Sequence, residues 1–197
     1  IVVGDNGVPL ITAGQTVYIG NSRPKWIGGM GNQFTYKSFS LSFLISARMG
    51  GRISSFTNAN IEGDAMSAKT LAGRDGFIVD GVKADGSKNT TSITAEQYWS
   101  KVGGRNTPAG EAFTYDASNI RLRELVLSYS IPQSTISKTP VKGATISFTG
   151  RNLFFFRNSA KGFDPELVVS TASGLIGIES FCLPFTSSYG LNLNLNF

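Results

Sequence analysis

Ser187-Ser188-Tyr189-Gly190-Leu191-Asn192-Leu193-Asn194-Leu195-Asn196-Phe197 is the stretch that decides the fold class. Tyr189, the leucines and Phe197 share one parity, and serine, glycine and asparagine share the other. A period of two is the pattern of a β-strand with one apolar and one polar face. The polar face carries uncharged amides, whereas a soluble sandwich would be expected to place some lysine or glutamate there. The stretch therefore predicts a strand of a transmembrane barrel, which needs about 9 to 11 residues.

Four further segments alternate in the same way. They are residues 25–36, 39–49, 120–131 and 144–154. Only Lys37 and Ser38 separate the first two, a spacing typical of a β-hairpin. The sequence thus predicts an all-β chain that supplies about five strands of a large antiparallel transmembrane β-barrel.

Short and long connections alternate between these strands. Residues 37–38 and 132–143 are short, whereas residues 54–119 and 155–186 are long. Outer-membrane barrels have short periplasmic turns and long extracellular loops. We therefore expect the two long segments on the cell surface.

The first long segment is expected to contain two short helices. Asn60 is placed to cap a helix over residues 61–71, with Gly73 just past its end. Thr94-Ala95-Glu96-Gln97 has the form of a capping box, which predicts a second helix.

Composition excludes several kinds of site. The chain has no histidine, so histidine-based acid–base catalysis and histidine-ligated metals are excluded. Cys182 is the only cysteine, and alone it forms neither an internal disulfide nor a metal site. The residues offer no catalytic triad, metal cluster or phosphate loop. We expect no enzyme activity, no metal and no cofactor.

The net charge of +5 invites a nucleic-acid interpretation. The excess of cations, however, lies outside residues 54–119 and mostly at strand ends, rather than along one helix. We therefore do not expect nucleic-acid binding.

Cations gather at the strand ends expected to be extracellular. They are Arg23, Lys25, Arg48, Arg52, Arg121, Arg123, Arg151 and Arg157. Strict alternation places Arg121 and Arg123 on the lipid-facing side, where they could bind lipopolysaccharide phosphates. It places Arg48 and Arg151 toward the lumen, where they could pair with Glu124 or line an entrance for a polar solute. A rim of solvated cations is an equal alternative, and a β-bulge would shift these faces by one residue.

A set of short motifs in a fixed order carries a resemblance. The motifs are Gly20-Asn21-Ser22-Arg23-Pro24-Lys25, Thr35-Tyr36-Lys37-Ser38-Phe39-Ser40-Leu41, Gly50-Gly51-Arg52-Ile53, Asp80-Gly81-Val82, Ile120-Arg121-Leu122-Arg123-Glu124-Leu125, Tyr129-Ser130-Ile131-Pro132, Gly150-Arg151-Asn152-Leu153-Phe154, Asp164-Pro165-Glu166 and the closing residues 189–197. The ordered set resembles the C-terminal region of SusC/RagA-type TonB-dependent outer-membrane transporters of Bacteroidetes. Ser40 stands where that family most often has aspartate.

The resemblance implies that residues 1–197 are the C-terminal part of a TonB-dependent receptor barrel in the bacterial outer membrane, with the plug and the other strands absent. Five strands cannot close a barrel of about 22. Open edges in hydrocarbon would leave backbone groups unpaired. The expected partners are therefore the remainder of the barrel and plug, a SusD-like surface lipoprotein acting as a lid, and the TonB complex. The implied activity is import of oligosaccharides or oligopeptides.

Four aromatic residues are singled out within this picture. Tyr98, Trp99 and Phe163 are candidate contacts to substrate or lid, since aromatic rings stack on sugars and anchor interfaces. Packing inside the core of the loop is an equal alternative. Phe197 resembles the terminal aromatic that the barrel-assembly machinery recognises. The competing hypothesis for the chain is a soluble β-sandwich that binds glycans on a surface protein.

Overall fold

A computed structural model describes residues 1–12, 17–105, 108–160, 162–167 and 175–197. The chain forms two compact units. The first comprises residues 1–22, 52–115 and 168–182, and the second comprises residues 23–51, 116–167 and 183–197. The second unit contains the long strands, while the first is built mainly from the long connection between two of them.

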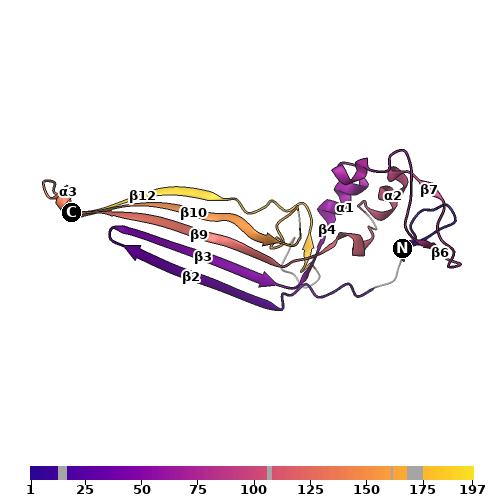
Figure 1. Cartoon of the computed structure of the whole chain (residues 1–197), viewed down its shortest axis with the longest axis horizontal. Helices are drawn as coiled ribbons and strands as arrows, with labels where there is room; N and C mark the ends of the chain where they lie inside the picture. The colour runs from indigo at the N-terminus through magenta and orange to yellow at the C-terminus, as the bar shows by residue number, and fades with distance from the viewer. Residues whose placement is uncertain (13–16, 106–107, 161, 168–174) are drawn as a thin grey trace. The chain divides into compact units, whose positions relative to one another are not determined.

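The second unit is a five-stranded antiparallel sheet (Figure 1). Its strands are β2 (Trp26–Tyr36), β3 (Phe39–Met49), β9 (Asn119–Ile131), β10 (Gly143–Asn158) and β12 (Ser188–Asn196). Their order in the sheet is β12-β10-β9-β3-β2. The five predicted strands are confirmed, and the largest difference is that β10 continues to Asn158. A short helix, α3 (Gln133–Ile136), lies in the connection from β9 to β10.

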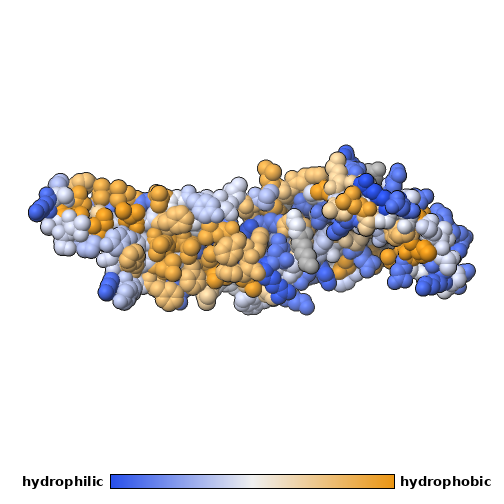
Figure 2. Space-filling view, turned by 45° about the horizontal axis from the view of Figure 1, so that its top comes forward, coloured by the Kyte–Doolittle hydropathy of each residue, from blue (hydrophilic) through white to orange (hydrophobic). Residues whose placement is uncertain are grey.

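The register gives this sheet one apolar and one polar face. Phe34, Leu41, Leu127, Phe148 and Leu191 follow one another across the five strands. Because directly paired residues point to the same side of a sheet, these side chains form a continuous apolar surface. The described residues leave it exposed: Leu191, for example, is 82% exposed. Figure 2 shows hydrophobic residues gathered over the strands.

The neighbouring row of paired residues is polar in every strand. It consists of Thr35, Ser40, Ser128, Ser147 and Asn192. The hydroxyl oxygens of Ser128 and Ser147 lie 2.9 Å apart and share a hydrogen bond across β9 and β10. This row places hydroxyl and amide groups on the side of the sheet opposite the apolar surface.

A β-bulge at Arg123 reverses one prediction. In β9, Glu124 pairs with Leu44 of β3, but the next paired residues are Leu122 and Ile45, so Arg123 is the extra residue. A bulge shifts the alternation by one. Leu122 therefore occupies the apolar face, and Arg121, paired with Ser46, occupies the polar face. The expectation that Arg121 and Arg123 face lipid is wrong, because it assumed an unbroken period of two.

The first unit combines short strands with four short helical segments. Its strands are β1 (Val2–Val3), β4 (Arg52–Ser55), β5 (Phe77–Ile78), β6 (Val82–Lys83), β7 (Ser92–Ile93), β8 (Thr114–Asp116) and β11 (Ile178–Glu179), of which β8 ends in the second unit. Its helices are α1 (Phe56–Gly63), α2 (Ala95–Val102) and the 3₁₀ turns η1 (Ala68–Leu71) and η2 (Gly110–Phe113). None of the helices in the described ranges is long and apolar enough to cross a membrane.

One of the two predicted helices is confirmed and the other is displaced. At α2, the Thr94 hydroxyl accepts a hydrogen bond from the backbone N–H of Gln97, and the Gln97 side chain accepts one from Thr94 N–H. The other helix does not start at Asn60. Ser55 caps α1 instead, since its hydroxyl accepts from Asn58 N–H at 3.1 Å. Asn60 lies inside α1, where its amide donates to the Phe56 carbonyl.

Candidate functional site

Aromatic residues lie at both ends of the apolar face of the sheet. Near the β2–β3 hairpin, the rings of Phe39 and Tyr129 are 4.7 Å apart. Toward the other end, Phe154 follows the same face and its ring contacts that of Phe156 at 4.9 Å. Apolar faces bounded by aromatic rings are typical of strands that cross an outer membrane.

The length of this face fits a membrane. Trp26 and Tyr36 occupy the two ends of β2, and both belong to the apolar face. Their separation corresponds to about 33 Å along a strand, from the rise per residue. A tilt of about 45° reduces this to about 23 Å along the membrane normal. The apolar band of outer-membrane barrels is about 25 Å tall.

A buried ionic cluster occupies the polar face near the β9 bulge. An Arg121 Nη2 hydrogen bond to Asp164 Oδ2 spans 2.5 Å, and Arg123 pairs with Glu166. The Arg123 Nε also donates to the Ser46 hydroxyl at 2.7 Å. Glu166 N–H donates to Asp164 Oδ1 at 3.0 Å, which fixes the turn that carries both carboxylates. The cluster holds residues 164–166, which follow β10, against the polar face.

Arg121 is the centre of this cluster. Its side chain is 5% exposed, and its guanidinium carbon lies 4.0 Å from the ring centre of Phe155 and 5.6 Å from that of Phe185. Such contacts between a cation and the face of a ring are attractive and exclude water. Arg121 is therefore enclosed. The expected contact with lipopolysaccharide required Arg121 and Arg123 to face lipid, and they do not.

Arg48 and Arg151 both lie on the polar face. Arg151 Nε donates to Glu124 Oε2 at 3.0 Å, so the expected pairing with Glu124 is present. Arg48 Nε lies 3.6 Å from Glu166 Oε1, at the margin of the buried cluster. Both arginines remain largely exposed. Their role in lining a passage stays a prediction.

The aromatic candidates in the first unit contribute to its small cores. Tyr98 packs against the buried Val3, Val79 and Ile93, and its ring meets that of Phe77 at 5.6 Å. Trp99 packs against the cluster of Ala59, Val102 and Phe113. Both rings are half-buried. Contact with substrate or lid stays a prediction for these two residues.

The other two aromatic candidates belong to the second unit. Phe163 is half-buried, and its carbonyl accepts a hydrogen bond from the Asn158 amide at 2.8 Å. Phe197 follows the last residue of β12 and is exposed. Its role in barrel assembly stays a prediction, as does the substrate contact of Phe163.

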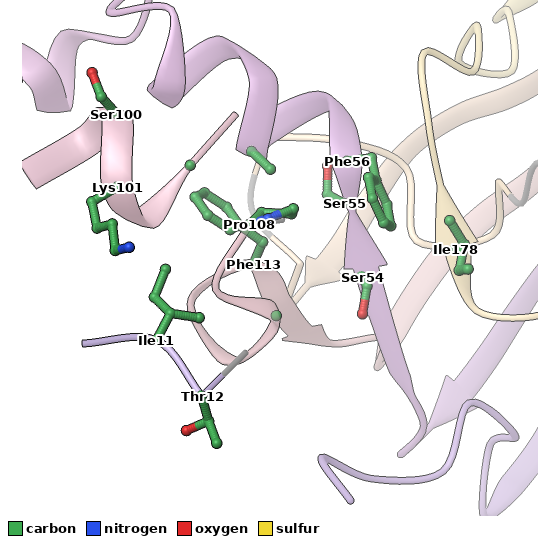
Figure 3. Close-up of a pocket in the computed structure, with 13 residues that line it drawn as sticks. Ile11, Thr12, Ser54, Ser55, Phe56, Ser100, Lys101, Pro108, Phe113 and Ile178 are labelled. Carbon is green, nitrogen blue, oxygen red and sulfur yellow. The ribbon is translucent and has the colours of Figure 1, made fainter. Parts of the chain in front are cut away.

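A pocket of about 630 Å³ lies within the first unit. Apolar side chains from separate segments form much of its lining: Ile11, Phe56, Ala59, Pro108, Phe113 and Ile178. Lys101, near the end of α2, projects toward Ile11 and Pro108 (Figure 3). A second hollow of about 710 Å³ shares Ile11, Thr12, Pro108 and Gly110 with the first. Two adjoining hollows therefore offer a largely apolar surface with one cation, Lys101, in the first lining and one carboxylate, Glu111, in the second.

Sequence reasoning missed both the ionic cluster and the pocket. Asp164-Pro165-Glu166 was visible as a motif, but alternation assigned Arg121 and Arg123 to the opposite face of β9. The pocket depends on residues more than one hundred positions apart, such as Ile11 and Ile178, and no local pattern joins them. In the described ranges, no three potential acidic, cysteine or histidine ligands gather closely enough to hold a metal ion.

Comparison with known proteins gives relatives in one functional class. TonB-dependent receptor P3 of Formosa agariphila is 24% identical over 184 residues, covering 91% of this chain and 17% of that receptor. TonB-dependent receptor P26 of the same organism is 27% identical over 197 residues, covering 96% of this chain and 19% of that receptor. No family model matches the chain.

Solved structures agree in fold. The RagAB peptide importer in its closed-closed state matches with a TM-score of 0.60 and 20% identity, over 89% of this chain and 18% of that one. The resemblance to SusC/RagA-type TonB-dependent transporters is confirmed. The sheet is accordingly part of a transmembrane β-barrel. The chain spans less than a fifth of the length of these TonB-dependent relatives.

Proposed function

We propose that residues 1–197 are the C-terminal part of an active transporter that imports bulky nutrients across the outer membrane, driven by TonB. The observation that carries this proposal is the continuous apolar face of the five long strands, bounded by aromatic rings and backed by a face that carries polar and charged residues. A surface of that size exposed to water would favour aggregation. Lipid is the solvent that such a face requires.

The two edges of the sheet support the need for further strands. β2 and β12 each pair with only one neighbour in the described residues. Unpaired backbone groups cost several kcal/mol each, roughly, in hydrocarbon. In our proposal, other strands of the same transporter pair with both edges, and its plug fills the lumen next to the polar face.

The cargo is proposed to be an oligopeptide or an oligosaccharide. The solved neighbours are described as peptide importers, so peptides are the first class to test. In RagAB the transporter is paired with a surface lipoprotein, which supports a SusD-like surface lipoprotein as the lid of this transporter. The first unit, built from the long connections, is proposed to lie outside the cell and to meet cargo and lid.

The lipid-facing assignment can be tested with spin labels. In the full-length transporter, Cys182 is first replaced by serine so that a single label can be placed by Leu191→Cys or Asn192→Cys. These positions are adjacent in β12 but belong to opposite faces. After reconstitution in lipid vesicles, the label at position 191 should collide frequently with dissolved oxygen, which concentrates in the bilayer, and rarely with a water-soluble nickel chelate.

A soluble β-sandwich predicts another pattern. There, position 191 would be buried between sheets, so its label would be shielded from oxygen and from nickel alike. That result, together with failure of the protein to enter vesicles, would reject the transporter proposal. The label at position 192 serves as the internal control for folding, because this position belongs to the polar face of the sheet in either case.

A further inference from the structure

The pocket in the first unit is lined by both apolar and polar residues. Its apolar residues come from β11, α1, η2 and the N-terminal segment. The volume of about 630 Å³ lies within the range of pockets that bind small ligands. A side chain placed there would be desolvated on several sides, which favours an apolar group.

The hydroxyl groups of Ser54 and Ser55 in the wall are already engaged. Ser54 Oγ shares a hydrogen bond with Thr114 Oγ1 at 2.7 Å. The Ser55 hydroxyl donates to the buried carboxylate of Glu179 at 2.5 Å, and Thr57 donates to the same carboxylate. Glu179 is therefore satisfied without a ligand. A neutral sugar, which needs many polar partners, would find few free ones on this wall.

Lys101 differs from the paired cations of the same unit. Lys69 binds Glu62, Lys83 lies 3.8 Å from Asp5, and Arg105 lies 3.7 Å from Asp64. Lys101 makes no salt bridge with a described residue, and it lines the pocket. Figure 3 shows its amine directed toward the space beside Ile11 and Pro108. A cation beside an apolar hollow complements an anion that carries an apolar group.

We infer that this pocket binds the C-terminal residue of a peptide, with the apolar side chain in the hollow and the carboxylate at Lys101. The adjoining hollow, whose lining includes Leu10, Tyr18 and Ile19 beside the carboxylate of Glu111, gives the preceding residues of the peptide a largely apolar surface to lie on. The inference rests on the proposed function, since it names one cargo class of the importer. The inference adds a binding site to the proposed function.

The test measures peptide binding to the full-length transporter in detergent by calorimetry. The probes are two forms of the tripeptide Ala-Leu-Phe, one with a free C-terminal carboxylate and one with a C-terminal amide. The native protein should bind the carboxylate form about fivefold more tightly, the upper end of what an exposed ion pair contributes. In Lys101→Met the two affinities should become equal, because only the ion pair distinguishes the two forms.

Two further variants distinguish a specific effect on the pocket from a general loss of structure. Lys88→Met removes an exposed cation of the same unit that does not line the pocket, so the fivefold preference should remain. Ser100→Trp, at an exposed helix position on the pocket wall, should obstruct the hollow and weaken both peptides.

Equal binding of both peptides to the native protein, or a preference that survives in Lys101→Met, would overturn the inference while leaving peptide import possible. Absence of binding by either peptide would overturn it as well. The spin-label experiment on β12 is independent of cargo, so the transporter proposal fails or stands separately.

Discussion

Arg121 shows how one buried side chain can organise the end of a strand. Its charge is enclosed by Phe155 and Phe185 and is balanced by Asp164. Removing one partner of a buried pair leaves the other charge without compensation, which costs about 3–5 kcal/mol. An exposed pair contributes about 0–1 kcal/mol, because water solvates and screens the separated charges.

The contrast between two arginines tests this. Arg121→Ala is expected to lower the free energy of unfolding of the detergent-solubilised transporter by about 3–5 kcal/mol. Arg151→Ala, which removes the exposed pair with Glu124, should lower it by about 1 kcal/mol or less. Urea unfolding monitored by tryptophan fluorescence measures both. Equal effects of the two substitutions would contradict the burial of the Arg121 cluster.

Which face a residue occupies could be predicted only as far as the alternation ran unbroken. Arg48 and Arg151 were assigned correctly to the polar face, because the register between them and the hairpin end is regular in β3 and β10. Arg121 was assigned wrongly, since the bulge at Arg123 depends on the pairing of β9 with β3 and β10. Nothing within the sequence of β9 itself marks that extra residue.

At the scale of elements, the long strands were predictable because each satisfies its pattern locally. The β2–β3 hairpin has the expected two-residue turn, in which Lys37 adopts a positive φ of 53°. The first helix was harder, since both Ser55 and Asn60 are good N-cap residues. Ser55 also donates to Glu179, which follows it by more than one hundred residues, and this contact fixes its place at the end of β4. Such a contact is invisible to local patterns.

Strand β12 offers a direct test of which face meets lipid. Leu191→Arg places a charge on the apolar face, in the row of Phe34 and between the midplane and one edge of the apolar band, and is expected to destabilise the barrel by about 1–3 kcal/mol. Asn192→Arg places the same charge on the polar face, in the row of hydroxyl and amide groups, and should cost about 1 kcal/mol or less. Urea titration in lipid vesicles gives both values. A larger cost at position 192 would reverse the assigned faces.

At the scale of the whole molecule, the described residues form a five-stranded sheet, which is too few strands to close a barrel of about 22. The two edges of this sheet would leave backbone groups unpaired in a membrane unless further strands pair with them, whereas the apolar face needs only lipid to cover it. The overall charge of +5 and the absence of histidine excluded site classes, but they did not indicate a barrel. The alternation of the last strand did, because it combines an apolar face with an uncharged polar one.

The measurement that tests the central claim most directly is the mass of every polypeptide in the assembly that carries this sequence, extracted from outer membranes in detergent and then denatured. The barrel account predicts that residues 1–197 occur with plug and further strand sequences, either in one long chain or in a tightly bound companion. A lipoprotein in the same mixture would identify the lid. Recovery of these residues as a monodisperse, water-soluble protein without such sequences would contradict the account.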